Sequence, residues 1–152
     1  MSAENFNISI LDQSSLDDLA GLFDAYRQFY GQDANKAACL TYLQKRMERN
    51  EVIVFGVSSE NTLVGFANIY PTFSSVSMRS VWTLNDLYVS HDMRQKGIAN
   101  KIMQTVKEEA EKNNIAHLQL ETAGDNHIAQ KCYETFGWQK NEFLSYYLKL
   151  GV

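Results

Sequence analysis

The stretch from Asp86 to Ala99 constrains the fold more than any other part of the chain. It begins as an apolar strand, passes through a short polar turn and ends in Arg-Gln-Lys-Gly-Ile-Ala, which is typical of a helix start. A helix N-terminus presents unpaired backbone N–H groups and the positive end of the helix dipole. Gly97 has no side chain to block those groups, and Arg94 and Lys96 add positive charge beside them. The stretch therefore predicts a strand-turn-helix unit that can bind a pyrophosphate.

The glycine pattern excludes the two most familiar phosphate loops. The pattern G-x-x-x-x-G-K-[ST] is absent from the chain. The dinucleotide pattern G-x-G-x-x-G is also absent, because Gly97 is the single glycine of this stretch. The remaining pattern is R-x-x-G-x-A, directly after a strand that ends in Leu-Tyr-Val. An ordinary strand-turn-helix unit with a basic turn would show the same six positions.

A second motif runs from Asp125 to Trp138. Asp125 or Asn126 can cap the start of a helix. Gly137 occupies the position where a left-handed residue commonly ends a helix. Between them, apolar side chains recur with helical spacing and form one stripe, namely Ile128, Ala129, Cys132, Tyr133 and Phe136. The motif therefore predicts an amphipathic helix over residues 126–136.

The two motifs together resemble the signatures of the GNAT N-acetyltransferases. The first matches the family's Q/R-x-x-G-x-G/A, which binds the pyrophosphate of acetyl-CoA, and the second matches N-x-x-A-x-x-x-Y-x-x-x-G-F with Trp138 in place of Phe. The resemblance is strongest over residues 80–140 and extends along the chain in the order of the elements. It implies an α/β fold of the GNAT type, with a mixed, mostly antiparallel central sheet of six to seven strands that contains a splayed parallel pair. About four helices are expected to flank this sheet.

Hydrophobic periodicity predicts the order of the elements along the chain. Helices are expected at 14–30, 35–49, 97–112 and 126–136, and a polar, Ser-rich loop at 71–77. Strands are expected at 6–11, 51–58, 62–70, 78–89, 116–121 and 142–150. No internal repeat, linker or low-complexity segment interrupts this order. The whole chain, 1–152, is therefore expected to form a single acetyltransferase domain.

The composition is ordinary for a globular protein and excludes several function classes. Of the 152 residues, 45% are hydrophobic and 21% are charged, and the net charge is −4. No broad face rich in Lys and Arg is evident, so a nucleic-acid partner is not expected. No apolar run approaches the roughly 18 residues of a membrane span, and the N-terminus does not read as a signal peptide. Cys39 and Cys132 read as reduced, buried thiols, no residue is predicted as a metal ligand, and the expected location is cytoplasmic.

The resemblance implies which residues hold acetyl-CoA. The pantetheine would lie between the strands expected at 78–89 and 116–121, and the N–H of Val89 or a neighbour would donate to the thioester oxygen. Asn126 and Ala129 of the second motif would lie beside the pantetheine, although Asn126 could act as a helix cap alone. The full set of expected cofactor residues is Leu87, Tyr88, Val89, Arg94, Gln95, Lys96, Gly97, Ile98, Ala99, Asn126 and Ala129.

The family resemblance also implies an acid for the reaction. Tyr133 occupies the position of the family's general acid. A tyrosine hydroxyl has an ordinary pKa near 10 and one proton to donate, which suits protonation of a leaving thiolate. The alternative is that Tyr133 is only a core residue of an amphipathic helix.

The base is less firmly marked by the sequence. Polyamine-type relatives often carry Glu-Asp before the last apolar triplet of this strand, where this chain has Asn85 and Asp86. Asn85 cannot accept a proton at neutral pH, whereas Asp86 shares the parity of Trp82, Leu84 and Tyr88. Apolar surroundings would raise the pKa of its carboxyl group. Glu121, a water chain, or a purely structural role for Asp86 remain as alternatives.

The acceptor side of the site is suggested by aromatic and acidic residues. Tyr26 and Tyr30 lie in a helix that borders the acceptor cleft in this family, and with Asp86 and Glu121 they favour a cationic amine. Asn85 and Glu121 are expected at the substrate, a small amine such as a polyamine. The segment 84–89 also looks like that of yeast histone and polyamine acetyltransferases, which dimerise, so a homodimer is expected. A non-catalytic CoA-binding module and a histone-directed lysine acetyltransferase remain as alternatives.

Overall fold

The computed structural model of the chain describes residues 5–151. Contacts within the chain divide it into two compact units, one that ends at Leu120 and one that begins at Glu121. The first unit contains a β-sheet and three long helices, and the second contains one helix and irregular chain. None of the helices within residues 5–151 has the length and apolarity needed to cross a membrane.

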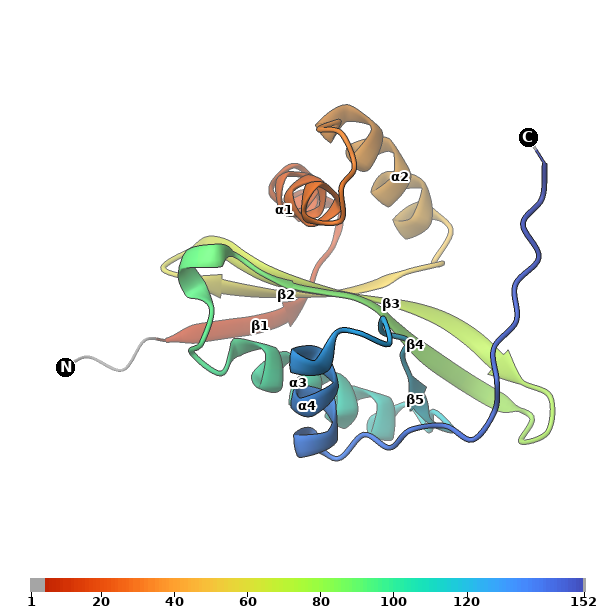
Figure 1. Cartoon of the computed structure of the whole chain (residues 1–152). Helices are drawn as coiled ribbons and strands as arrows, with labels where there is room; N and C mark the ends of the chain where they lie inside the picture. The colour runs from red at the N-terminus through yellow and green to blue at the C-terminus, as the bar shows by residue number, and fades with distance from the viewer. Residues whose placement is uncertain (1–4, 152) are drawn as a thin grey trace. The chain divides into compact units, whose positions relative to one another are not determined.

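The first unit is built on a five-stranded sheet in the order β1-β2-β3-β4-β5 (Figure 1). Neighbouring strands from β1 to β4 are antiparallel, and β5 pairs with β4 in parallel. The expected mixed, mostly antiparallel sheet with a parallel pair is therefore confirmed. The strands are β1 (Phe6–Ile10), β2 (Ile53–Ser59), β3 (Thr62–Ser74), β4 (Arg79–Val89) and β5 (Leu118–Gln119).

Helices cover both faces of this sheet (Figure 1). Helices α1 (Leu16–Phe29) and α2 (Lys36–Glu48) lie on one face, and α3 (Ile98–Lys112) lies on the other. The side chain of Asp12 accepts a hydrogen bond from the backbone of Ser14 in the 3-10 turn before α1, and Asn35 caps α2 by accepting one from Ala38. These local signals start the helices close to the positions that the sequence predicts.

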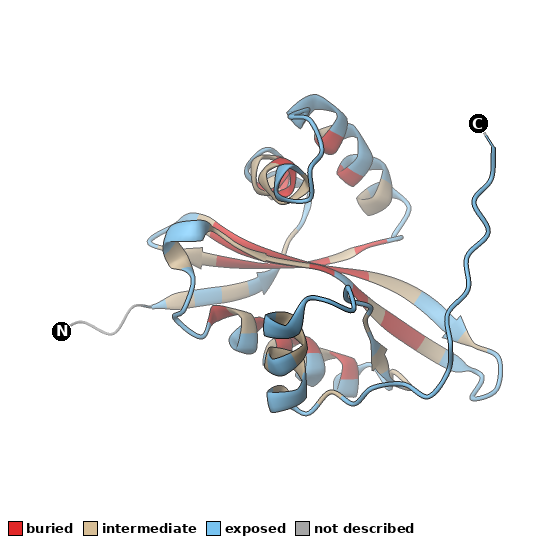
Figure 2. Cartoon of the chain, viewed as in Figure 1, coloured by how far each residue is buried: buried red, intermediate tan, exposed pale blue. Residues whose placement is uncertain are grey.

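Two apolar layers hold the helices against the sheet. Leu19 and Phe23 of α1 and Leu43 of α2 pack with Val54 and Phe66 of the sheet and are buried. On the other face, α3 buries a stripe of apolar side chains, which are Ile98, Ile102, Met103, Val106 and Ala110. Figure 2 shows that the buried residues of this unit concentrate in the central strands and on the helix sides that face them. Because apolar burial is the main stabilising term, the two layers fix the sheet between the helices.

Strand β4 contains a β-bulge at Asn85, which changes the orientation of everything after it. Leu84 pairs with Ile69, whereas Asp86 pairs with Asn68, so β4 has one residue more than β3 at this point. Asn68 and Ile69 are consecutive residues of β3 and therefore point to opposite faces of the sheet. Their partners Asp86 and Leu84 consequently point to opposite faces as well. The expectation that Asp86 shares the face of Trp82 and Leu84 is therefore wrong. Asp86 lies on the face that α1 and α2 cover, where Phe66 also packs.

Strand β3 is longer than the sequence predicts, and the loop expected at 71–77 is largely absent. The strand continues through Pro71 to Ser74. Pro71 pairs with Trp82, whose own N–H bonds the carbonyl of His117 and thus points away from β3. The missing N–H of Pro71 would therefore face the β2 side, but β2 begins only at Ile53, opposite Ile69. A proline costs no ladder hydrogen bond at this position.

The strand expected at 142–150 is not formed, so the described residues hold five strands rather than six to seven. A strand exists only through pairing, and no ladder within residues 5–151 includes this segment. Its apolar residues also run consecutively through Tyr146 and Leu148 instead of alternating. Strand β5 is shorter than the predicted 116–121, so Glu121 lies outside it.

Candidate active site

The start of α3 has the shape of an anion site. Gly97 is the N-cap and has a left-handed backbone with φ of 76°, and no side chain caps the helix. Gln95 is also left-handed, with φ of 64°, so the turn before the helix curls tightly. A Cβ placed on Gly97 would meet no atom within 4 Å. The first N–H groups of a helix without a side-chain cap, here including those of Ile98 and Ala99, can bind a pyrophosphate.

Arg94 connects this turn to the end of β4 and to α1. Its Nε donates a hydrogen bond of 3.0 Å to the carbonyl oxygen of Val89. Its guanidinium carbon lies 5.5 Å from the ring centroid of Tyr88 and 5.6 Å from that of Phe29. A guanidinium has five N–H donors, so the bond to Val89 leaves donors for an anion. Arg94 can therefore hold the strand end and bind a phosphate oxygen together.

One edge of β4 is open beside this turn. Strand β5 pairs with β4 only at Trp82 and Thr83, so no strand pairs with residues 84–89 on that edge in the described ladders. The N–H of Ser90 bonds the carbonyl of Val64, which fixes the alternation of the backbone groups. The groups of Leu87 and Val89 consequently point toward the open edge. An extended ligand with amide groups can pair there as another strand would.

Tyr88 lies between Leu87 and Val89, and its backbone groups have the opposite orientation to theirs. Its backbone groups point toward β3 by the same alternation, and its ring packs against Tyr26 and Phe66. The ring centroid of Tyr26 lies 5.9 Å from that of Phe66 and 5.9 Å from that of Tyr88. Tyr30 packs edge-on against Tyr26 at 5.0 Å but is exposed. The structure thus brings Tyr26 and Tyr88 together and places Tyr30 at the outer end of the same aromatic row.

The carboxylate of Asp86 is buried, with 6% of the residue exposed. The Nδ2 group of Asn68 donates to its Oδ2 over 3.0 Å, and the Nδ2 group of Asn85 donates to its Oδ1 over 3.0 Å. Asn68 is fully buried, whereas Asn85 is exposed. Sequence reasoning missed Asn68. The available signal was a single amide residue within the apolar run of β3.

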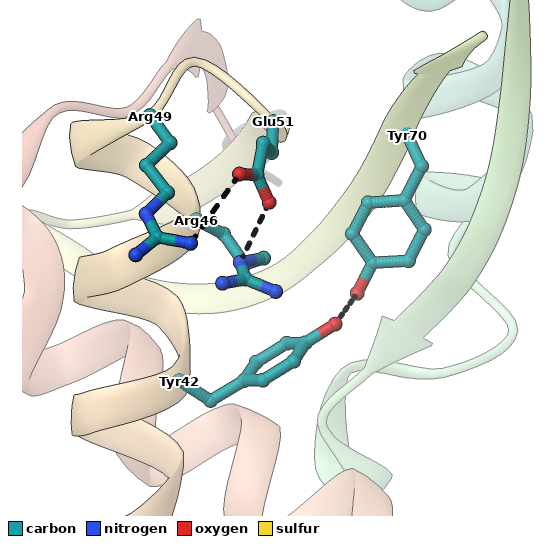
Figure 3. Close-up of polar contacts among 5 residues, drawn as sticks. All are labelled: Tyr42, Arg46, Arg49, Glu51 and Tyr70. Atoms are coloured by element: carbon teal, nitrogen blue, oxygen red, sulfur yellow. Dashed lines mark hydrogen bonds and ion pairs between the residues drawn. The ribbon is translucent and has the colours of Figure 1, made fainter.

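A pair of tyrosines links α2 to β3 close to this carboxylate. The hydroxyl oxygens of Tyr42 and Tyr70 lie 2.8 Å apart (Figure 3). Burial raises the pKa of Tyr70, and the bond to Tyr42 and the charge of Asp86 act in the same direction. The phenol of Tyr70 therefore remains protonated and neutral. The C-terminal end of α2 is held separately, because Glu51 pairs with Arg46 at 3.1 Å and with Arg49 at 4.0 Å (Figure 3).

A cavity of about 360 Å³ lies between α1 and α2. Asp24 is buried nearby and accepts a hydrogen bond of 2.8 Å from the backbone of Asn35. Burial raises the pKa of the Cys39 thiol, which keeps this thiol protonated. The lining residues are Phe23, Arg27, Asn35, Ala38, Cys39 and Tyr42. Tyr42 thus has a role both in this cavity and in the link to β3.

The second unit contains α4 (His127–Phe136) and the second sequence motif. Asn126 caps this helix, because its Oδ1 accepts a hydrogen bond of 3.2 Å from the N–H of Ala129. Gly137 ends it with φ of 124°, as the motif predicts. The N–H groups of Gly137 and Trp138 both bond the carbonyl of Tyr133, and the rings of Tyr133 and Trp138 pack edge-on at 6.3 Å.

Comparisons with known proteins agree with this geometry. Residues 18–138 match the family model described as Acetyltransferase (GNAT) family. An N-acetyltransferase of Bacillus subtilis (strain 168), described as uncharacterized and named YhfO, is 33% identical over 129 residues, which is 85% of this chain and 87% of the relative. A probable acetyltransferase of Haemophilus influenzae (strain ATCC 51907 / DSM 11121 / KW20 / Rd) is 33% identical over 107 residues, 70% of this chain and 68% of the relative.

Solved structures share the fold. The crystal structure of a probable acetyltransferase superposes with a TM-score of 0.91 and 34% identity, and covers 96% of this chain and 99% of that one. An aminoglycoside N-acetyltransferase, AAC(6')-Iy in complex with CoA, superposes with a TM-score of 0.81 at 19% identity over 97% of both chains. The chain therefore belongs to the GNAT family of acetyltransferases and is an N-acetyltransferase that uses acetyl-CoA.

Proposed function

We propose that this enzyme acetylates the primary amine of a small cationic molecule, with polyamines as the leading substrate class. The observation that carries this proposal is the buried Asp86 carboxylate on the same sheet face as the ring of Tyr88. A carboxylate attracts an ammonium group, and aromatic rings attract it further through cation–π interactions. Both features lie next to the open edge of β4, where the acetyl donor would be held.

We propose that residues of the first unit hold the cofactor. The N–H groups at the start of α3 would bind the pyrophosphate, and the charges of Arg94 and Lys96 would support them. The open-edge groups of Leu87 and Val89 would bind the pantetheine amides, and the Val89 N–H would stabilise negative charge on the acyl oxygen. When bound, acetyl-CoA supplies the acetyl group as an activated thioester. The complete proposed set is Leu87, Tyr88, Val89, Arg94, Gln95, Lys96, Gly97, Ile98 and Ala99, with Asn126 and Ala129 of the second unit.

Two residues are proposed to move protons. The carboxylate of Asp86 would accept a proton from the acceptor ammonium, which frees the nitrogen lone pair for attack. The hydroxyl of Tyr133 would donate its proton to the leaving thiolate. The amide donors from Asn68 and Asn85 orient the Asp86 carboxylate for this role.

The remaining acceptor residues are proposed to bind the rest of the substrate. Tyr26 and Tyr30 form an aromatic row at the end of α1, and Asn85 is exposed beside the buried carboxylate. Glu121 would add a second negative charge and thereby favour a molecule with more than one amine. This arrangement suits an extended polyamine better than an amino acid.

An amine panel tests the proposal directly. Thiol release from acetyl-CoA is measured with polyamines, diamines, amino acids and Lys peptides of histone sequence. We expect the highest kcat/KM with polyamines, and Asp86→Asn should lower kcat at least tenfold while leaving acetyl-CoA affinity unchanged. Preference for Lys peptides would move the function to protein acetylation. Cofactor binding without release by any amine would exclude the proposed reaction.

We propose further that the protein is a cytoplasmic homodimer. The support is the likeness of residues 84–89 to the corresponding segment of dimeric yeast acetyltransferases. Light scattering at micromolar concentration should give twice the mass of the chain. A mass of one chain at all concentrations would exclude the dimer.

A further inference from the structure

Four side chains form a compact block on the sheet face that α1 and α2 cover. Phe66 pairs with Tyr88, and Asn68 pairs with Asp86, at successive positions of the β3–β4 ladder that share a face. The aromatic pair therefore lies directly beside the polar pair. The ring centroids of Phe66 and Tyr88 are 6.1 Å apart, and Asn68 Nδ2 and Asp86 Oδ2 are 3.0 Å apart.

The orientation of the Asn68 amide follows from its partner. A carboxylate accepts hydrogen bonds and does not donate them, so Asn68 must direct its Nδ2 group to Asp86. Its Oδ1 atom is consequently directed elsewhere. This oxygen is buried, and it has no hydrogen-bond donor among residues 5–151. A buried carbonyl oxygen without a donor is destabilising, so the position calls for a donor from outside the chain.

One of the two amides that donate to the Asp86 carboxylate belongs to an exposed side chain. Asn85 donates to Oδ1 of Asp86, but it is an exposed bulge residue. A displaced neutral amide can bond water, whereas a cation gains a charge-assisted bond to the carboxylate. A cationic donor can therefore replace Asn85 at one carboxylate oxygen, and the other carboxylate oxygen is bonded by the side chain that carries the oxygen without a donor.

We propose that Asn68 is a specificity-determining residue whose Oδ1, together with the Asp86 carboxylate, binds the primary ammonium group of the acceptor. The inference rests on the proposed amine acetylation. A primary ammonium has three N–H donors, so it can bond both acceptors and retain one donor for a third partner. An N-methylated amine loses one donor and adds a methyl group against Phe66 and Tyr88. The block therefore selects primary amines over their N-methylated analogues.

Matched variants at two asparagines test this assignment. Asn68 and Asn85 each donate one bond of 3.0 Å to Asp86, but only Asn68 carries the buried oxygen without a donor. We expect Asn68→Leu to raise the KM of the best primary amine about tenfold, and Asn85→Leu, which removes a residue proposed to contact the substrate, to raise it by a smaller factor. The preference for the primary amine over its N-methyl analogue should fall in Asn68→Leu and persist in Asn85→Leu. The KM for acetyl-CoA should be unchanged in both.

The outcomes separate this inference from the proposed function. Equal effects of the two variants, or an unchanged methylation preference in Asn68→Leu, would show that Asn68 only supports the carboxylate and would overturn the assignment. If the wild type acetylates no amine, calorimetric titration of the same amine pair into the three proteins decides the question. Weaker primary-amine binding in Asn68→Leu alone would retain the assignment, and unchanged binding would overturn it. A thermal unfolding scan checks folding, and Asn68→Ser replaces the leucine variant if that variant is unfolded.

Discussion

The hydroxyl oxygens of Tyr42 and Tyr70 lie 2.8 Å apart, and this hydrogen bond links α2 to β3. Tyr70 is the more buried partner, and its pKa is raised by burial, by the bond and by the charge of Asp86. Protonation of this pair is therefore part of the stability of the first unit.

The free energy of unfolding should fall as the pH rises above about 10, the ordinary tyrosine pKa. In that range the unfolded chain loses the Tyr70 proton while the folded chain retains it, so unfolding releases protons and becomes easier. Tyr70→Phe should show a shallower loss between pH 8 and pH 10.5 in urea titrations. Tyr147→Phe, at an exposed position of the second unit, is the control. The raised pKa of Cys39 also lowers the free energy of unfolding as the pH rises, and it does so equally in the wild type and in both variants.

Gly97→Ala should weaken acetyl-CoA binding, because it adds a side chain at the N-cap of α3, beside the N–H groups proposed to bind the pyrophosphate. Gly31→Ala is the matched control, since Gly31 is also left-handed, with φ of 86°, and has open space around it. Both variants should lose about 1 kcal/mol of stability through backbone strain. Calorimetry should show a several-fold weaker affinity for Gly97→Ala only. Equal affinities in the two variants would contradict the pyrophosphate assignment.

Arg94→Ala should reduce acetyl-CoA affinity about tenfold, the size expected for one charge-assisted contact. The loss should shrink at high salt, because mobile ions screen the exposed charge. Lys112→Ala removes a cation from the last turn of α3, at the opposite end from Gly97, and should leave the affinity unchanged. Fluorescence titration at two salt concentrations measures both. A salt-independent loss would indicate that Arg94 acts through its bond to Val89 instead.

Tyr133→Phe should lower kcat by about a hundredfold and leave the dissociation constant of acetyl-CoA unchanged, because the substitution removes the hydroxyl group that donates the proton and keeps the ring. The packing of the ring on Trp138 is preserved in phenylalanine, so the helix should remain folded. Stopped-flow measurement of thiol release gives kcat, and calorimetry gives the affinity. Parallel losses of both quantities would assign Tyr133 to structure alone.

Local patterns in the sequence predicted most elements of the fold. Asn35 and Asn126 cap helices, and Gly97 and Gly137 bound them, close to the expected positions. These signals are local, because capping depends on a few neighbouring residues. The turn from Arg94 to Ala99 was predicted for the same reason.

Features that depend on pairing between strands were not predicted. The bulge at Asn85 is visible only in the register with β3, and the continuation of β3 through Pro71 depends on where β2 begins. Asn68 and the Tyr42–Tyr70 bond are absent from the predicted site, because both depend on contacts between residues distant in sequence. The segment 142–150 was overpredicted, since apolar composition alone does not provide a partner strand.

The extra residue in β4 determines what a deletion at this point would do. Leu84 already pairs with Ile69 and Asp86 with Asn68, so loss of the single codon for Asn85 would keep both pairings and leave Asp86 on the side of α1 and α2. The ladder would become continuous, and the carboxylate would lose the hydrogen bond that Asn85 donates to it. Such a deletion would remove the bulge without exchanging the two sides of the strand, which separates the role of the Asn85 side chain from that of the strand register.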